Sequence, residues 1–293
     1  MRAELNATQV DLNRENLELA GGNGPAEADD ATAWLSRAVM VVAHPDDEVL
    51  WLSSALAAVH KVIFCFNDYP AVPELGAGRT AAIAQYPLTT AQTLDVAESG
   101  SFDFADWSNP EPTRYGLQLR APNSVRRTYE ATFETLIHRL DPILSTAPVV
   151  LTHNPWGEYG HEDHVQVYRA VKALQSRYGF ELWYSNYASN RSWPLMMMHL
   201  EGFDHRYRTL NTNATLAGAL GRLYQQNRCW TWYKDYRWPE TETLLRDGPI
   251  QTNVAVAGRG GNFPVQALRV DFRRPDGGKT RLRNIWARLG RRR

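Results

Sequence analysis

Two clusters of histidine and acidic residues lie far apart in this 293-residue chain. They are His44-Pro45-Asp46-Asp47-Glu48 and His161-Glu162-Asp163-His164. Two imidazoles and one carboxylate are sufficient to bind a divalent metal that keeps an open coordination position. His44 and Asp47 are spaced to point the same way from the first turn of a helix, and His164 can complete the set. We therefore expect His44, Asp47 and His164 to bind a divalent metal, and these ligand types alone do not distinguish Zn²⁺ from Fe²⁺.

The other members of the two clusters suit the hydrolysis of an unactivated amide. Asp46 can act as a general base that accepts a proton from metal-bound water. His161 can protonate a leaving amine or stabilise an oxyanion, and Asp163 can hold the His161 ring in place. An acidic turn that only caps a helix would explain the first cluster alone. The second cluster, which follows another predicted strand, favours a shared site.

Both clusters follow short apolar runs that predict buried strands. Residues Ala38–Ala43 are apolar and rich in β-branched side chains, and Pro45 must end the strand. The run Pro148–Thr152 precedes the second cluster, and apolar residues at helical spacing follow it as far as Tyr178. Strands that alternate with helices predict an α/β fold with a Rossmann-like, mostly parallel sheet and helices on both faces. Because parallel strands end at one edge of the sheet, the two clusters can meet there.

The motifs Ala43–Glu48 (AHPDDE) and Tyr159–His164 (YGHEDH) resemble those of the PIG-L/LmbE family of metal-dependent N-deacetylases. That family includes deacetylases of the mycothiol and bacillithiol pathways and of glycosylphosphatidylinositol biosynthesis. The first motif matches throughout, and the second has Glu162 where the family has proline. The resemblance covers roughly residues 39–178. It implies the same roles: zinc ligands His44, Asp47 and His164, the base Asp46, the assisting acid His161, and Asp163 behind it.

Two further residues are expected to contact the substrate. Arg79 resembles a family arginine that approaches the substrate, but Ala82 stands where the family usually has an acid. Arg79 is predicted at a loop–helix junction beside two strand ends, where it can touch a substrate oxygen, and a plain surface role is the alternative. Tyr159 matches a tyrosine of the mycothiol-type relatives, and its phenol can either donate to an oxyanion or simply pack.

Composition excludes several classes of protein. The 32 basic and 32 acidic residues balance, so no overall field favours a nucleic-acid partner. The two cysteines, Cys65 and Cys229, do not form a disulfide framework. No stretch has the length of a membrane span, and the N-terminus lacks the pattern of a signal peptide. We expect a cytoplasmic protein, and the sequence does not indicate its oligomeric state.

The chain divides into three predicted regions. They are a flexible N-terminal arm (1–33), an α/β deacetylase domain (34–240) and a C-terminal extension (241–293). The sequence after Tyr184 is irregular and aromatic-rich, and its indoles either line a sugar-binding rim or cover the core. Residues Lys279–Arg293 have the spacing of a basic amphipathic helix. Such a helix either makes peripheral contact with an anionic membrane or docks on the sheet.

The sequence therefore predicts a zinc-dependent N-deacetylase that releases acetate from an N-acetylated amino sugar, such as an N-acetylglucosamine conjugate. Three alternatives stay open. A non-hydrolytic Fe(II) enzyme can use the same ligands, but it would not require Asp46. A glycan- or lipid-binding protein of the same fold would leave Asp46 and His161 without a purpose. A hydrolase of a non-sugar amide would use the same residues, since no pattern identifies the group attached to the sugar.

Overall fold

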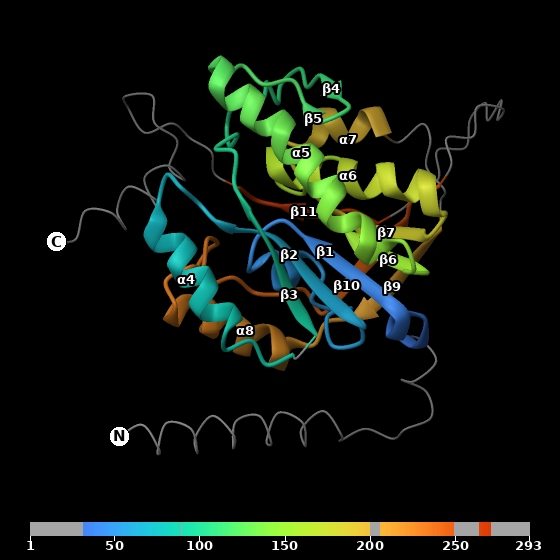
Figure 1. Ribbon diagram of the computed structural model, residues 1–293. Helices are drawn as coiled ribbons and strands as arrows, with labels where there is room; N and C mark the ends of the chain where they lie inside the picture. The colour runs from blue at the N-terminus through green and yellow to red at the C-terminus, as the bar shows by residue number, and fades with distance from the viewer. Residues whose placement is uncertain (1–31, 89, 200–205, 249–263, 271–293) are drawn as a thin grey trace, which may run out of the picture.

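The computed structural model describes residues 32–88, 90–199, 206–248 and 264–270. These residues form a seven-stranded sheet with the order β3-β2-β1-β6-β7-β10-β9 (Figure 1). Its strands are β1 (Ala38–Val42), β2 (Lys61–Asp68), β3 (Ala91–Ala97), β6 (Val149–Thr152), β7 (Glu181–Ser185), β9 (Tyr207–Asn211) and β10 (Thr241–Arg246). The pairs from β3 to β7 are parallel, whereas β10 runs antiparallel to both β7 and β9. The predicted α/β fold with a mostly parallel sheet is confirmed.

Helices cover both faces of this sheet, as predicted (Figure 1). On one face lie α5 (Asn123–Leu144) and α6 (Glu162–Tyr178), and on the other lie α4 (Pro73–Ile83) and α8 (Ala214–Gln226). The side chains of β1 alternate between the two resulting cores. Val39 and Val41 belong to the core that includes residues of α5 and α6, whereas Met40 and Val42 belong to the core that includes residues of α4 and α8. Because β1 is buried on both faces, it has no polar position.

The remaining elements are short. They are η1 (Ala33–Arg37), α3 (Asp47–Trp51), α7 (Trp193–His199), the antiparallel pair β4 (Pro112–Thr113) and β5 (Gly116–Leu117), and the parallel pair β8 (Tyr187–Ser189) and β11 (Gln266–Leu268). Among the helices in the described part of the chain, none combines the length and the hydrophobicity that a membrane crossing needs.

The helix α4 begins earlier than the sequence predicts. It starts at Pro73, so Arg79 lies in its interior and not at its first turn. Gly76 and Gly78 have the character of loop residues, but tertiary contacts override that preference. A Cβ atom on Gly78 would lie 2.4 Å from the backbone oxygen of Asn227, the residue directly after α8. The close contact between α4 and α8 therefore requires glycine at position 78.

The C-terminal part of the chain contributes to the sheet. The predicted boundary at residue 240 falls directly before β10, which lies between β7 and β9. Trp232, Tyr236 and Trp238 are partly buried against the core on the α4 and α8 side. Residues 1–31 and the predicted basic helix Lys279–Arg293 lie outside the described residues, so the N-terminal arm and that helix stay predictions.

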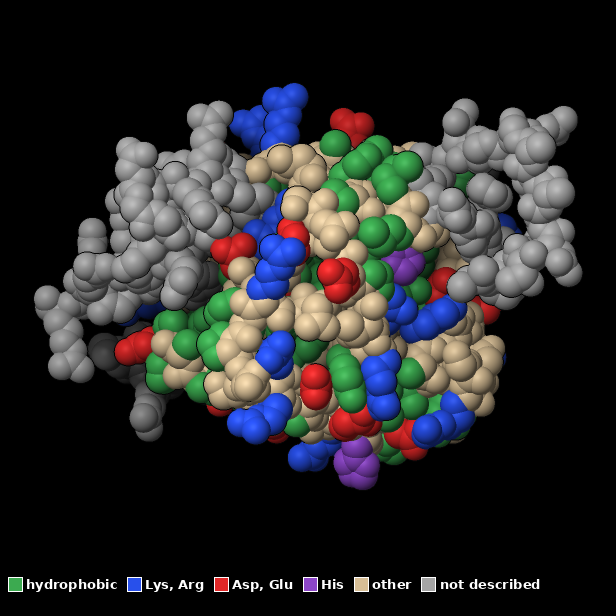
Figure 2. All heavy atoms as spheres, turned by 90° about the horizontal axis from the view of Figure 1, so that it is seen from above, with side chains coloured by type: hydrophobic (Ala, Val, Ile, Leu, Met, Phe, Trp, Pro, Cys, Tyr) green, Lys and Arg blue, Asp and Glu red, His purple; other side chains and the backbone are tan. Residues whose placement is uncertain are grey.

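Charged side chains are distributed evenly over the face that Figure 2 shows. In the described part of this face, acidic and basic side chains are intermixed and neither sign gathers into a broad area. This agrees with the equal numbers of basic and acidic residues, 32 of each. The described part of this face therefore shows no basic stripe of the kind that is typical of nucleic-acid binding.

Candidate metal centre and catalytic site

The first cluster leaves the end of β1 in a sharp turn. Asp46 has a φ of 113°, a backbone conformation that residues other than glycine rarely adopt and that costs roughly 1–3 kcal/mol. Two hydrogen bonds hold this conformation. Asp46 N donates to Glu48 Oε2 (3.1 Å), and Leu50 N donates to Asp46 O (3.0 Å). The turn makes Asp47 the first residue of α3.

Glu48 connects this turn to α8. Its side chain is fully buried, and its Oε1 accepts hydrogen bonds from Tyr224 OH (2.6 Å) and Tyr86 OH (3.1 Å). Burial raises the pKa of Glu48 to about 8. The third acid of the first motif is therefore a structural support for Asp46, a role that the sequence did not reveal.

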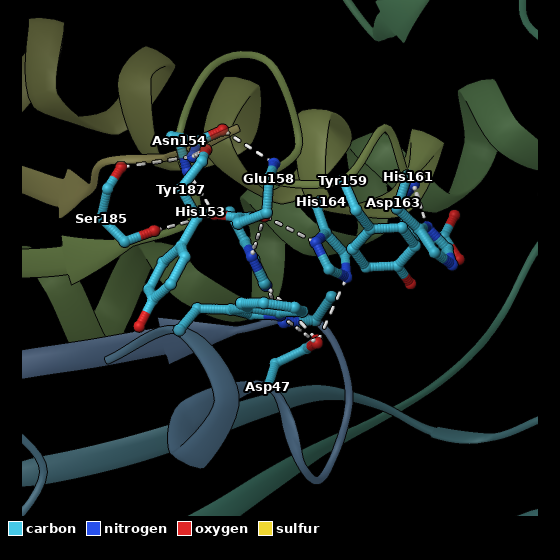
Figure 3. A network of polar contacts seen from close by, with 12 residues as sticks. Asp47, His153, Asn154, Glu158, Tyr159, His161, Asp163, His164, Ser185 and Tyr187 are labelled. Carbon is cyan, nitrogen blue, oxygen red and sulfur yellow. Dashed lines mark hydrogen bonds and ion pairs between the residues drawn. The ribbon is translucent and has the colours of Figure 1, made fainter. Parts of the chain in front are cut away.

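Glu158 organises the histidines of the second cluster. It lies in the loop between β6 and α6, and dashed lines in Figure 3 mark the contacts of its carboxylate with His153 and His164. Glu158 Oε2 lies 3.0 Å from His153 Nδ1 and 2.7 Å from His164 Nδ1. Burial favours the neutral acid, but the charges of His153 and His164 outweigh it and lower the pKa of Glu158 to about 2. The carboxylate thus stays ionised and fixes the orientation of both rings.

Two buried ring nitrogens, His44 Nε2 and His164 Nε2, have no hydrogen-bond partner among the described residues. In each ring Nδ1 faces a carboxylate, since His44 Nδ1 lies 3.0 Å from Asp47 Oδ2 and His164 Nδ1 lies 2.7 Å from Glu158 Oε2. With the proton on Nδ1, the lone pair of each Nε2 is available to a cation.

The carboxylate of Asp47 lies beside these nitrogens. Its Oδ1 is 3.3 Å from His164 Nε2, close to the separation of about 3.3 Å expected between two ligand atoms of tetrahedral zinc at bond lengths near 2.0 Å. Trp51 Nε1 donates to the same Oδ1 (3.0 Å) and orients the carboxylate. Asp47 Oδ1 and His164 Nε2 therefore have the spacing of two ligands of one divalent metal ion, and His44 as the third ligand stays a prediction.

His164 belongs to two groups of close donor atoms. These groups are His44, His161 and His164, and Asp47, His153 and His164, each with its donor atoms within 4.8 Å of one another. In two of these histidines, a ring nitrogen already accepts a hydrogen bond from the backbone. His153 Nε2 accepts a hydrogen bond from Ala43 N (2.8 Å), and His161 Nδ1 accepts one from Asp163 N (3.1 Å). His44 and His164 remain the histidines that have both a free lone pair and an oriented ring.

Negative charge dominates the centre. Burial favours the neutral form of the His44 ring, but the negative charges of Glu98 and Asp47 have the larger combined effect. They raise the pKa of His44 to about 9. Asp47 and Glu158 likewise overcome burial and raise the pKa of His164 to about 9. Burial alone would raise the pKa of Asp47, but the positive charges of His164 and His44 hold this pKa well below its usual range. The centre therefore favours added positive charge, either as protons or as a metal ion.

Asp46 and His161 offer one proton acceptor and one proton donor. Burial and then the charge of Asp47 raise the pKa of Asp46 to about 7, and its Oδ1 is buried without a hydrogen-bond partner among the described residues. Burial, followed by the charges of His164 and His44, lowers the pKa of His161. Because His161 Nδ1 accepts the Asp163 amide, the neutral ring carries its proton on Nε2.

Asp163 contacts the His161 ring through its backbone and not, as expected, through its carboxylate. The Asp163 carboxylate instead accepts a hydrogen bond from Ser101 Oγ (2.7 Å) and lies 3.5 Å from His44 Nε2. Ring packing then places His161 4.6 Å from His164 and 5.0 Å from His44, measured between ring centres.

Of the two expected substrate-contacting residues, Arg79 is buried and paired. It is 2% exposed, so the alternative of a surface residue is wrong. Its guanidinium forms an ion pair with Glu98, whose Oε1 is 3.6 Å from His44 Nε2. Glu98, directly after β3, is thus the acid that pairs with Arg79. No pattern in the surrounding loop sequence distinguishes Glu98, which is why the sequence did not identify it.

Tyr159 packs within a group of aromatic rings beside the histidines. Its ring centre lies 5.4 Å from that of His164, 5.7 Å from Trp51 and 4.9 Å from Trp232. Burial raises the pKa of its phenol well above the usual value, so Tyr159 stays protonated. This agrees with the packing alternative, and a contact between Tyr159 and a substrate stays a prediction.

Glu162, the residue that replaces the family's proline, fastens a loop over His161. Its side chain is fully buried and accepts hydrogen bonds from Ala105 N (2.9 Å), Trp107 Nε1 (2.9 Å) and Asp103 N (3.1 Å). Phe102 of the same loop packs 4.7 Å from the His161 ring. The exchange of proline for glutamate thus shapes the wall of the site.

We expect Glu162→Gln to lower the free energy of unfolding by about 1–3 kcal/mol, because an amide N–H would face one of the three donors that the carboxylate now accepts. Urea unfolding followed by fluorescence measures this change. A matched control is Glu134→Gln on α5, where an exposed carboxylate pairs with Arg114. That change should stay within about 0.5 kcal/mol. Equal effects of the two substitutions would contradict the role assigned to Glu162.

Comparisons with known proteins agree with the resemblance seen in the motifs. Residues 39–175 match the PIG-L family, described as GlcNAc-PI de-N-acetylase. Among curated proteins, none matches the sequence significantly.

Solved structures of deacetylases are distantly similar. A deacetylase–teicoplanin complex is 11% identical with a TM-score of 0.44, over 71% of this chain and 97% of its own. The A40926 pseudoaglycone deacetylase is 12% identical with a TM-score of 0.46, over 75% of this chain and 100% of its own. A zinc-inhibited form of a teicoplanin deacetylase is 11% identical with a TM-score of 0.46, over 74% and 100%.

Proposed function

Residues 39–175 form a PIG-L family domain, and from this premise we propose that the protein is a zinc-dependent hydrolase that removes the N-acetyl group of an amino sugar or glycoconjugate. The description of the family as GlcNAc-PI de-N-acetylase supports an N-acetylglucosamine conjugate as the substrate class. The observation that carries the proposal is the pair of unpartnered buried nitrogens, His44 Nε2 and His164 Nε2, beside the carboxylate of Asp47.

In this proposal His44, Asp47 and His164 hold the metal. A bound zinc ion supplies a Lewis acid for the acetamide carbonyl and lowers the pKa of water. The protein's part is to keep the three donors oriented, which Glu158 does for His164 and Trp51 does for Asp47. Fe²⁺ also binds to two histidines and one carboxylate, so the metal content of the isolated protein must be measured together with its activity.

In the proposed reaction Asp46 acts as the general base, and His161 donates a hydrogen bond to the developing oxyanion. Asp46 Oδ1, which has no hydrogen-bond partner among the described residues, takes a proton from the attacking water, and a pKa of about 7 suits a base that works near neutrality. The neutral His161 ring donates from Nε2 to the oxygen that becomes negative as the carbonyl carbon turns tetrahedral. When the C–N bond breaks, Asp46 returns its proton to the amine. One amide and one water thus yield one amine and one acetic acid, which ionises to acetate and gives its proton to the amine or to solvent.

The direct test is acetate release from a panel of N-acetylglucosaminyl conjugates by the zinc-loaded protein. We expect release that stops on removal of the metal by a chelator and resumes on addition of zinc. Release without bound metal would overturn the metal requirement. Stoichiometric zinc with no release from any sugar conjugate would overturn the sugar substrate and direct the assay to non-sugar amides or to ligand binding.

Other expectations about the surroundings of this enzyme stay predictions. Cys65 and Cys229 are both free and buried, as a reducing cytoplasm would allow. Membrane contact through Lys279–Arg293 and the oligomeric state are not tested by the described residues.

A further inference from the structure

Thr231 contacts the proposed base from a distant part of the chain. Its backbone N donates to Asp46 Oδ2 (2.9 Å), and its Oγ1 donates to the same oxygen (2.7 Å). Thr231 lies beyond residue 175, where the match to the PIG-L family ends. The sequence around it, in the aromatic-rich region after α8, contains no motif that would mark it as part of the site.

The two bonds distinguish the oxygens of the Asp46 carboxylate. Oδ2 is engaged by two donors of Thr231, whereas Oδ1 is buried and has no hydrogen-bond partner among the described residues. A carboxylate that is held by one oxygen cannot turn freely about its χ2 angle. The direction in which Oδ1 points is therefore set by Thr231, while the Asp46 backbone is held separately by Glu48.

The segment that carries Thr231 is itself fixed on the core. Cys229 N donates to Tyr224 O (3.0 Å) at the end of α8, and Trp238 Nε1 donates to Val49 O (2.6 Å) in α3. Between them, the ring of Trp232 packs edge-on against Trp51 at 5.0 Å. Thr231 therefore presents its two donors from a rigid support, which is the condition for precise positioning of another group.

We infer that Thr231 is a positioning residue, which holds Asp46 Oδ2 so that Oδ1 is the oxygen presented to the attacking water. This inference rests on the proposed function and deepens it, because it extends the catalytic site beyond the family domain. A hydrogen bond to a charged group contributes more than one between neutral groups, and its loss here affects the geometry of the base and not the binding of substrate.

The test compares Thr231→Val, which keeps the branched shape and the backbone N–H, with Thr231→Ser, which restores the hydroxyl. We expect Thr231→Val to lower kcat for acetate release by about 10- to 100-fold with KM within about twofold and zinc content unchanged. Thr231→Ser should recover most of the activity. Unchanged kcat in Thr231→Val, or an equal loss in Thr231→Ser, would overturn the inference.

A matched control is Thr209→Val in β9, which removes a hydroxyl that pairs with Thr243 Oγ1 at 3.0 Å. It should leave kcat unchanged. If Thr231→Val does not fold, Thr231→Ala provides the same loss of the hydroxyl in a smaller residue.

Crystal structures of the zinc-loaded wild type and Thr231→Val separate this inference from the proposed function. A rotated Asp46 carboxylate in the variant supports positioning even if the wild type releases no acetate from any conjugate. An Asp46 carboxylate that stays in place in the variant overturns the inference, whatever the activity of the wild type.

Discussion

Asp46→Asn is expected to keep its zinc and to lose acetate release by a factor of about 10² to 10⁴, the usual contribution of a positioned general base. Asparagine has nearly the same shape as aspartate, and its amide oxygen can still accept the bonds from Thr231. Its NH2 group then takes the place of Oδ1, and an amide nitrogen cannot accept a proton from water. The loss should therefore appear in kcat.

The measurement is steady-state acetate release together with the zinc content of the same preparation. Asp141→Asn is a suitable control, since that carboxylate lies on α5 and pairs with Arg177 at the surface. Its activity should equal that of the wild type. Full activity in Asp46→Asn would remove Asp46 from the proton transfer, and loss of zinc in the same variant would mean that Asp46 helps to hold the metal.

His164→Gln and His153→Gln should differ sharply in zinc affinity, although the two rings stack 3.9 Å apart and both contact Glu158 Oε2. His164 Nε2 has no hydrogen-bond partner in the described part of the chain, whereas His153 Nε2 accepts the amide of Ala43. We expect His164→Gln to weaken zinc binding by more than about 100-fold. His153→Gln should cost at most about 10- to 100-fold, as is usual for a residue that only supports a ligand.

Competition with a chelator of known affinity gives both dissociation constants. The thermal stability of each metal-free variant shows whether a weaker affinity reflects lost folding. A larger loss in His153→Gln than in His164→Gln would point to the group of Asp47, His153 and His164 as the ligand set.

The sequence was sufficient to place the two motifs at one edge of a parallel sheet. Ala38–Ala43 is apolar and buried throughout, Val150 and Leu151 of the second run are likewise buried, and β1 and β6 are neighbours. His44 and His164 therefore meet because their strands do, and this follows from strand polarity without any knowledge of side-chain contacts.

The groups that complete the site could not be predicted in this way. Glu98 and Thr231 reach it from segments with no periodic pattern, and their roles depend on where those segments fold back. The left-handed turn at Asp46 is stabilised by Glu48, which the sequence presents only as another acid before a helix. The interior position of Arg79 in α4 does not follow from the sequence, because the glycines before it resemble a loop and only the contact of Gly78 with Asn227 explains them.

The sheet order also decides which piece of this chain can be produced alone. The family match stops at residue 175, but β7, β10 and β9 all follow it and occupy one side of the sheet. A fragment that ends there would leave β6, an almost entirely buried apolar strand, as an unpaired edge. Exposed apolar edges pair with other chains, so such a fragment should aggregate on expression, and a soluble product requires at least the chain through β10.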